Sequence, residues 1–291
     1  MPDNKNPYGG NFEKFYRKKK RSSASGSASP QRRKKKKRAS PQSPAQSVAS
    51  PSPEKVNYRL NKYLAHAGIA SRREADELIK QGLVTVNGKV ITQMGYSVQP
   101  GDIVRFKGSI ISPERKVYIL LNKPKDYITT TCDERNRKTV LDLIKGATPY
   151  RVYPVGRLDR NTTGLLLLTN DGDLAQKLSH PRHEVKKVYA ARLDKALHPE
   201  DRLQMMKGIQ LEEGLAKADA VEYTDPNDAS RIGLEIHIGW NRVIRRMFEQ
   251  LGYQVLQLDR VSYAGLTKKN LPRGKWRFLT RKEIIMLKHF S

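Results

Sequence analysis

The 291-residue chain carries 56 lysines and arginines against 29 aspartates and glutamates, a formal net charge of +27 that favours a polyanionic partner, with nucleic acid as the first candidate. Its single cysteine, Cys132, excludes a disulfide framework and a cysteine-based zinc site, and the six histidines show no spacing typical of metal ligands. No apolar run approaches the roughly 20 residues of a membrane helix and no apolar signal segment begins the chain, so we expect a soluble, cytoplasmic protein without a membrane span.

The first 57 residues differ in composition from the rest and are expected to form a disordered tail. They combine Ser, Pro and Ala with seven consecutive cations, Arg32–Arg38, and such a segment buries too little apolar surface to offset the entropy of ordering it. The tail carries 15 basic and 3 acidic residues, which is +12 of the net charge and leaves +15 for the remainder. It is interpreted as a solubility extension or as an RNA-binding arm.

Residues 58–108 are predicted to form a small module of two helices and a few short strands. A first helix in YRLNKYLAHAG ends at Gly68, and a second, in SRREADELIKQG, begins with Ser71 and Glu74 at the spacing of a capping box. VTVNGKVI alternates around Asn87–Gly88, a strong signal for a β-hairpin, and QPGDIVRF adds a turn and a last strand. One face of the module is expected to carry four cations: Arg59, Lys62, Arg72 and Arg73.

The order of these elements, RLNKYLAHAGIASRREADELIKQGLVTVNGKVI followed by PGDIVRF, resembles the S4 RNA-binding domain. The resemblance implies that the helical face binds structured RNA through its phosphates and shape, because side chains cannot read the deep major groove of an A-form helix. The alternative is that the four cations are ordinary solubilising charges.

From residue 116 to 288 the sequence alternates short strands, turns and helices, and residues 109–115 are expected to connect the two parts. Strands are predicted in KVYILLNKP, RVYPVGRLD, GLLLLTND, KVYAARL and RIGLEIHIG, and helices in DLAQKLSHP and NRVIRRMFEQLG. This pattern lacks repeated βαβ units and is typical of an α+β domain. The NDGD stretch, Asn170–Asp173, is interpreted as a hairpin turn rather than a cation site.

The stretch GRLDRNTTGLLLLTNDGD places a carboxylate, Asp159, between Arg157 and Arg160, just ahead of four consecutive leucines. A charged turn of this kind is usually solvated or forms a structural ion pair. The Thr-Thr-Gly sequence that follows predicts a tight polar turn, which would hold Asp159 at a strand end beside a cleft. The two arginines would then attract the phosphates that flank a target nucleotide or keep the carboxylate ionised, so that it can act as a nucleophile or an electrostatic stabiliser.

GRLDRNTTGLLLLTNDGDL resembles the catalytic motif of the RsuA-type pseudouridine synthases, and three further motifs occur in the order found in that family. LLNKPKDY resembles the early Lys-Pro motif, KKVYAARL supplies Tyr189, and GWNRVIRRMFEQLG resembles the late motif with its pair of arginines. Together with the S4 module, the resemblance covers residues 58–288. It implies a catalytic domain, within 116–288, that is built on a largely antiparallel, mixed sheet.

The resemblance also assigns roles to individual residues. Asp159 would be the nucleophile, Tyr189 the aromatic residue that stacks on the target uracil, and Arg245 the cation that forms a salt bridge with the aspartate. Lys123 of LLNKPKDY is interpreted as the end of a strand rather than as a catalytic group. Trp240 stands where a basic residue is common in the family, which leaves the phosphate contacts at that position open.

These observations predict an enzyme that converts a specific uridine of ribosomal RNA to pseudouridine. NRVIRRMFE and LPRGKW are most similar to family members that act on large-subunit RNA; the alternatives are small-subunit or another RNA, or a noncatalytic ribosome-assembly factor. A nonspecific DNA-binding protein would explain the tail but not the S4 pattern. Because the reaction involves neither redox change nor hydrolysis, we expect no metal and no organic cofactor, and a monomer is the default expectation.

Overall fold

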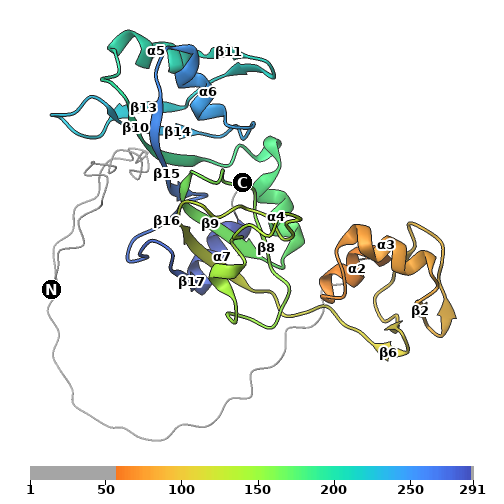
Figure 1. Ribbon diagram of the computed structural model, residues 1–291. Helices are drawn as coiled ribbons and strands as arrows, with labels where there is room; N and C mark the ends of the chain where they lie inside the picture. Colours follow the sequence, from red (N-terminus) through yellow and green to blue (C-terminus); the bar gives the residue numbers. More distant parts are fainter. Residues whose placement is uncertain (1–56, 290–291) are drawn as a thin grey trace, which may run out of the picture.

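The computed structural model describes residues 57–289, and the predicted basic tail lies outside this range. A small N-terminal module is followed along the chain by a larger domain that is built on one extended sheet (Figure 1). Both parts combine helices with mainly antiparallel strands, which confirms the α+β class. Between residues 57 and 289, no helix combines the length and the apolar character that crossing a membrane requires.

The small module packs two helices against a four-stranded sheet whose order is β3-β2-β5-β6. Leu60 and Leu64 from the first helix and Ala75 and Ile79 from the second are buried against Val84 and its neighbours in the sheet. The elements are β1 (Tyr58–Arg59), α2 (Leu60–His66), α3 (Arg72–Lys80), β2 (Val84–Val86), β3 (Lys89–Val90), β4 (Ser97–Val98), β5 (Val104–Phe106) and β6 (Ser109–Ile110).

Two local predictions for this module are confirmed. Ser71 caps α3 by accepting from the Glu74 backbone N–H, while the Glu74 carboxylate accepts from the Ser71 backbone N–H, which is the reciprocal capping box. Asn87 and Gly88 join β2 to β3 with φ values of +50° and +81°, the left-handed conformation that a two-residue hairpin turn needs.

The larger domain is a nine-stranded sheet with helices on both faces. Its central order is β13-β14-β10-β15-β9-β7-β17, with β16 paired to β15 and β8 paired to β9. The elements are β7 (Tyr118–Lys123), the 3₁₀ helix η1 (Asp142–Ile144), β8 (Tyr153–Pro154), β9 (Thr163–Thr169), α4 (Gly172–Ser179), the 3₁₀ helix η2 (Pro181–His183), β10 (Lys187–Leu193), α5 (Pro199–Lys207), β11 (Ile209–Leu211), β12 (Gly214–Ala216), β13 (Ala220–Tyr223), β14 (Arg231–Ile236), α6 (Val243–Gln250), β15 (Val255–Tyr263), β16 (Leu266–Thr267), β17 (Trp276–Phe278) and α7 (Arg281–Lys288).

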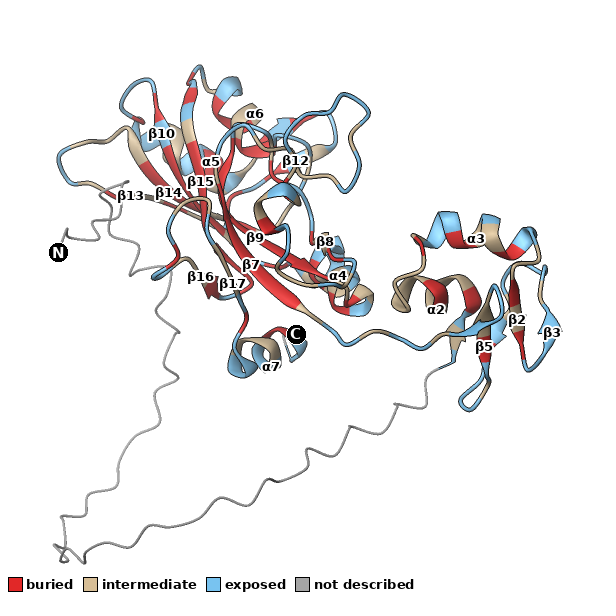
Figure 2. Cartoon of the chain, turned by 60° about the horizontal axis from the view of Figure 1, so that its bottom comes forward, coloured by how far each residue is buried: buried red, intermediate tan, exposed pale blue. Residues whose placement is uncertain are grey.

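The four leucines that follow the Asp159 motif form the middle of β9 and are buried on both faces of the sheet (Figure 2). Leu166 and Leu168 belong to the core under α5 and α6, whereas Leu165 and Leu167 belong to the core under α4 and α7. The alternation follows from the two-residue period of a strand. The segment between Val155 and Thr162 is therefore attached to the most deeply buried strand of the domain.

The two halves of the sheet meet where β9 runs parallel to β15. Every other pairing in the described sheet is antiparallel, and the parallel contact involves only Thr163 with Asp259 and Gly164 with Arg260. Gly164 has a φ of +105°, and a Cβ at this position would lie 2.3 Å from the Arg260 carbonyl oxygen. Only glycine allows the two backbones to approach this closely.

Two predictions about this region need correction. The Thr-Thr-Gly sequence does not form a turn, because Thr163 and Gly164 already belong to β9. The NDGD stretch is not a hairpin turn: Asp171 is the N-cap of α4, its carboxylate accepts from the Leu174 backbone N–H, and Gly172 is the first helical residue. Asp171 also accepts a hydrogen bond from the buried Tyr118 hydroxyl at 2.7 Å, so its carboxylate is held by the strand as well as by the helix.

Candidate active site

Asp159 lies half-buried in the loop between β8 and β9, where two cavities meet. The first, here called the tyrosine cavity, has a volume of about 270 Å³ and is lined by Asp159, Tyr189, Tyr263, Arg245 and Arg260 among others. The second, here called the arginine cavity, has a volume of about 650 Å³ and extends from Asp159 over the segments 128–137 and 239–242. The carboxylate therefore stands beside a smaller, partly aromatic space and a wider, polar one.

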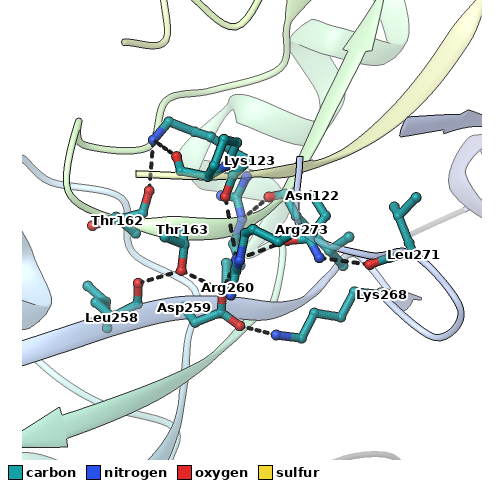
Figure 3. Close-up of polar contacts among 12 residues, drawn as sticks. Asn122, Lys123, Thr162, Thr163, Leu258, Asp259, Arg260, Lys268, Leu271 and Arg273 are labelled. Carbon is teal, nitrogen blue, oxygen red and sulfur yellow. Dashed lines mark hydrogen bonds and ion pairs between the residues drawn. The ribbon is translucent and has the colours of Figure 1, made fainter. Parts of the chain in front are cut away.

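The loop that carries Asp159 is anchored by Lys123, the last residue of β7. The Lys123 side chain is fully buried, and its ammonium donates to the backbone carbonyls of Pro124, Asp159, Arg160 and Thr162 at 2.8 to 3.1 Å. Figure 3 shows its contact with Thr162. Burial lowers the pKa of Lys123 to about 8, although the negative charge of Asp159 opposes this shift. Lys123 ends a strand, as expected, but it also fixes the loop backbone from Asp159 to Thr162.

Tyr189 lies on β10, between Leu234 of β14 and Arg260 of β15 in the strand register. Its side chain is 8% exposed and lines the tyrosine cavity together with Asp159. A ring held in a strand between two neighbouring strands keeps a fixed orientation, which suits an aromatic platform for a planar base. The structure thus brings together the aspartate and the tyrosine that the sequence singled out, although 30 positions separate them.

Arg245 lies on α6, half-buried, and lines the same cavity. The expected salt bridge is not formed: within residues 57–289 no ion pair closer than 4.0 Å joins Arg245 to Asp159, and the Arg245 Nη1 instead donates to the Val255 carbonyl at 2.7 Å. That bond ties α6 to the start of β15 and directs the guanidinium along the strand. Burial lowers the pKa of Arg245, and the charge of Asp159 opposes this shift, so the two groups interact through space.

The two arginines next to Asp159 in sequence are both exposed. Arg160 forms an ion pair with Asp126 at 3.1 Å, which turns its charge toward the β7–η1 connection. Arg157 has no ion pair within 4.0 Å in the part of the chain that the structure describes, and it lines both cavities. Arg157 is thus the better placed of the two to receive a phosphate beside the carboxylate.

Two cations of the tyrosine cavity, the buried Arg260 and the half-buried Lys187, were not predicted from the sequence. Arg260 is 2% exposed, its guanidinium carbon lies 4.5 Å from the centroid of the Tyr263 ring, and its Nε donates to the Leu165 carbonyl at 2.7 Å. Lys187 donates to the His237 carbonyl, and burial lowers its pKa to about 8, with the charge of Arg260 acting in the same direction. No clear signal in the sequence singled out either residue, because Lys187 begins its strand and Arg260 follows a charged neighbour, Asp259.

A third unpredicted group is the carboxylate of Asp259, which is fully buried beside the parallel contact of β9 and β15. It accepts from the Thr163 hydroxyl at 2.6 Å, pairs with Arg273 at 2.6 Å and also contacts the Lys268 ammonium (Figure 3). The two cations lower the pKa of Asp259 against the effect of burial. This cluster joins β15, β9 and the segment before β17, so it is a structural support directly behind the Asp159 loop.

The four cations predicted for the small module lie away from both cavities. Arg59, Arg72 and Arg73 are exposed, whereas the Lys62 ammonium forms an ion pair with Asp173 of α4. A second ion pair, between Glu74 and Arg151 at 3.3 Å, also connects the small module to the larger domain. Lys62 therefore has a partner within the protein, and only three of the four side chains face solvent.

No cluster of three or more His, Cys, Asp or Glu side chains suited to a metal ion occurs among residues 57–289. The groups that the cavities do offer are a carboxylate, aromatic rings and several cations. They suit chemistry on a planar base that is attached to an anionic backbone.

The sequence and the fold identify the class of protein. The profile of the S4 domain matches residues 59–104, and the profile of RNA pseudouridylate synthases matches residues 117–250. A characterised relative shares 46% of its residues over 95% of its own length. The chain belongs to the family of RNA pseudouridine synthases, enzymes that isomerise uridine in RNA to pseudouridine.

That relative is the ribosomal large subunit pseudouridine synthase B of Bacillus subtilis, which aligns over 234 residues, or 79% of this chain. The dual-specificity RNA pseudouridine synthase RluF of Escherichia coli is 40% identical over 232 residues, which cover 79% of this chain and 78% of RluF. Among solved structures, a crystal structure of a pseudouridylate synthase superimposes with a TM-score of 0.58 at 28% identity, and covers 79% of this chain and 99% of that one. The family expected from the motifs is confirmed.

Proposed function

We propose that the protein converts a uridine of large-subunit ribosomal RNA to pseudouridine, with Asp159 as the catalytic carboxylate, Tyr189 as the platform for the base and Arg245 as the cation that stabilises the carboxylate. One observation supports this above all: Asp159, Tyr189 and Arg245, from three different elements, line one cavity beside a basic groove. The similarity to the Bacillus subtilis large-subunit enzyme supports the choice of RNA.

The reaction breaks the bond between uracil N1 and the ribose C1′ and forms a bond between C5 and C1′. The hydrogen on C5 is lost as a proton and N1 gains one, so atoms and electrons balance without an external reagent. Before this, the uridine must leave its stack, which costs a few kcal/mol. Stacking on an aromatic ring recovers roughly 1–3 kcal/mol per base, and this is the role we propose for Tyr189.

The carboxylate of Asp159 has three routes open to it: attack on C1′, attack on C6 of the base, or assistance to elimination from the sugar. All three need an ionised carboxylate close to the glycosidic bond. Lys123 supports the position of the carboxylate by fixing carbonyls of the loop, and the positive charge of Arg245 attracts the carboxylate through space. The missing direct ion pair leaves the carboxylate free to reach the substrate.

RNA binding is proposed to combine two surfaces. Arg157 and Arg160 would contact phosphates next to the target, and Arg59, Arg72 and Arg73 of the small module would contact a more distant part of the RNA. Such contacts release counterions, so affinity should fall steeply with salt. Lys62 contributes less in this proposal, because it already pairs with Asp173.

The test compares Asp159→Asn with Asp126→Asn, which makes the same chemical change at an exposed neighbour. Pseudouridines are mapped in ribosomal RNA from cells that lack the gene and are supplied with either variant or the wild type. We expect one large-subunit position to be restored by the wild type and by Asp126→Asn but not by Asp159→Asn, while the purified Asp159→Asn protein still binds the RNA.

Restoration by Asp159→Asn would contradict the assignment of the carboxylate, and a position that appears in small-subunit RNA would contradict the choice of substrate. A noncatalytic assembly factor predicts indifference to Asp159 but sensitivity to Arg72→Ala and Arg73→Ala. We also propose that the enzyme acts as a monomer in the cytoplasm, where ribosomal RNA is made; light scattering of the purified protein tests the first point and cell fractionation the second.

A further inference from the structure

The arginine cavity is larger than the tyrosine cavity, and the proposed function uses only Arg157, Asp159 and Arg160 of its lining. Both cavities share the lining residues Gly156–Asp159, Gly239, Trp240 and Arg242, so they open into each other beside the reacting carboxylate. Whatever RNA enters the tyrosine cavity through this junction must continue across the arginine cavity. The lining carries five arginines against three carboxylates: Arg135, Arg137, Arg157, Arg160 and Arg242 against Asp133, Glu134 and Asp159.

Several of these arginines are positioned by carboxylates of the protein, and others are available for a ligand. Arg137 pairs with Asp133, and Arg242 pairs with Glu249 at 3.4 Å. In the described residues 57–289, neither Arg135 nor Arg157 forms an ion pair within 4.0 Å. Two available guanidiniums and a net positive lining suit the phosphates on either side of a nucleotide.

Trp240 lies at the junction and lines both cavities. It is half-buried and packs on the edge of the main core, and its Cη2 lies 3.6 Å from the place where a side chain on Gly214 would begin. The indole is therefore supported by the β11–β12 hairpin on one side while the other side faces the cavities. A supported aromatic ring surrounded by arginines is the arrangement with which proteins bind single-stranded nucleotides.

We propose that the arginine cavity is a second nucleotide site, in which Trp240 stacks on a base that flanks the target uridine and Arg157 and Arg135 bind the adjoining phosphates. The proposal rests on the proposed pseudouridine synthase function of the neighbouring cavity. When the target base leaves its stack, its neighbour loses one stacking partner. Trp240 replaces that partner and offsets part of the cost of extruding the uridine.

The first experiment uses the fluorescence of Trp240 to detect its contact with RNA. The chain contains two tryptophans, and the other, Trp276, lies on β17 and packs edge-to-face on Phe278 at 5.4 Å between ring centroids. The full-length Trp276→Phe variant therefore reports on Trp240 alone. We expect its fluorescence to be quenched by an in vitro transcript of large-subunit ribosomal RNA, with the midpoint at the dissociation constant measured by filter binding. Unchanged fluorescence at saturating RNA would overturn the proposal.

The second experiment identifies the base. An RNA hairpin around the mapped uridine is made with an abasic site at each of the three positions before and after the target. From the strength of stacking we expect Trp240→Ala to weaken binding of the intact hairpin by about 5- to 150-fold, and one abasic position to weaken wild-type binding to a similar extent. When Trp240→Ala binds the hairpin with that abasic site, the loss of affinity should be no larger than the loss from either change alone. Additive losses at every position would refute the stacking contact.

Two further variants separate stacking from charge and from misfolding. Trp240→Phe keeps an aromatic face and should restore most of the affinity. Trp240→Ala should leave the dependence of log K on log salt unchanged, whereas Arg157→Ala should reduce its slope by about one. If the wild type forms no pseudouridine, the proposed function fails, but the fluorescence titration with the transcript still decides whether Trp240 contacts RNA.

Discussion

Replacement of Lys123 by methionine tests whether the catalytic loop depends on one buried ammonium. Methionine matches the length of the lysine stem but cannot donate to the four carbonyls. Arg160 O also accepts from the Asp126 N–H, and Asp159 O also accepts from the Thr162 N–H, so these two carbonyls keep a partner. The carbonyls of Pro124 and Thr162 lose theirs.

The expected loss of stability is small, because two effects oppose each other. A buried carbonyl without a partner costs about 1–3 kcal/mol, so the two carbonyls together cost about 2–6 kcal/mol. The change also removes a buried charge, and a pKa lowered from 10.5 to about 8 corresponds to about 3 kcal/mol of unfavourable burial. The free energy of unfolding should therefore fall by about 0–3 kcal/mol.

The expected loss of activity is larger. A reactive group displaced by about 1 Å can lose a hundredfold in rate, and the loop with Asp159 would be free to shift by that much. Release of the C5 proton from tritiated RNA under single-turnover conditions measures the rate, and urea unfolding measures stability. The control is Lys125→Met, an exposed lysine two positions away. If Lys123→Met matched Lys125→Met in rate, the anchoring role would be wrong.

Deprotonation of the Lys123 ammonium should change the reaction rate and the stability in opposite directions as the pH rises. Burial lowers the pKa of both Lys123 and Lys187 from 10.5 in the unfolded chain to about 8 in the folded protein. Between pH 8 and pH 10.5, the unfolded state therefore binds more protons than the folded state. Stability should rise with pH in this window, by up to about 1.4 kcal/mol per pH unit for each lysine. The rate should fall above pH 8, because a neutral amine has one donor fewer for the loop carbonyls. A rate that stayed flat to pH 9.5 would contradict this.

Three further outcomes are expected. Gly164→Ala should prevent folding or lower the melting temperature strongly, because its Cβ would lie 2.3 Å from a carbonyl oxygen; a variant with wild-type circular dichroism and melting would contradict the close contact. Asp259→Asn should cost about 3–5 kcal/mol in urea unfolding, since it removes the buried negative charge that both Lys268 and Arg273 contact. Ser71→Ala should remove a helix cap and cost about 0.5–2 kcal/mol in stability of the small module, measured by thermal unfolding, without changing single-turnover rates.

Much of the fold could be predicted because local patterns agree with the tertiary structure. Capping residues, the Asn-Gly hairpin and the run of leucines each have one favourable conformation, and each adopts it. Helix α4 shows the limit: Asp171 and Gly172 suit a turn as well as a helix start, and the choice was made by the buried hydroxyl of Tyr118, 53 positions away. The sequence around Asp171 cannot reveal a hydrogen-bond partner that lies so far away along the chain.

In the candidate site, too, the sequence predicted some features, whereas others depend on tertiary contacts. The sequence motifs led to Asp159 and Tyr189, and the fold places both on one cavity. The partner of Arg245 could not be predicted, because its hydrogen bond to the Val255 carbonyl depends on how closely α6 packs on β15. The anchoring role of Lys123 was missed for a related reason. Its acceptors are backbone carbonyls, which every residue carries, so the types of side chain in the sequence do not identify them.

The parallel contact between β9 and β15 has a consequence for how the enzyme acquires activity during folding. The contact of Thr163 with Asp259 joins positions 96 residues apart, and within one half of the sheet β7 also waits for β17, where Trp276 pairs with Leu121. Long-range closures of this kind form late, because the chain entropy must be lost before the contact is gained. The loop with Asp159 ends at this junction, so a chain with only one half of the sheet formed would present RNA-binding cations but no ordered carboxylate. We therefore expect catalysis only from fully folded molecules, and RNA binding without modification from partly folded ones.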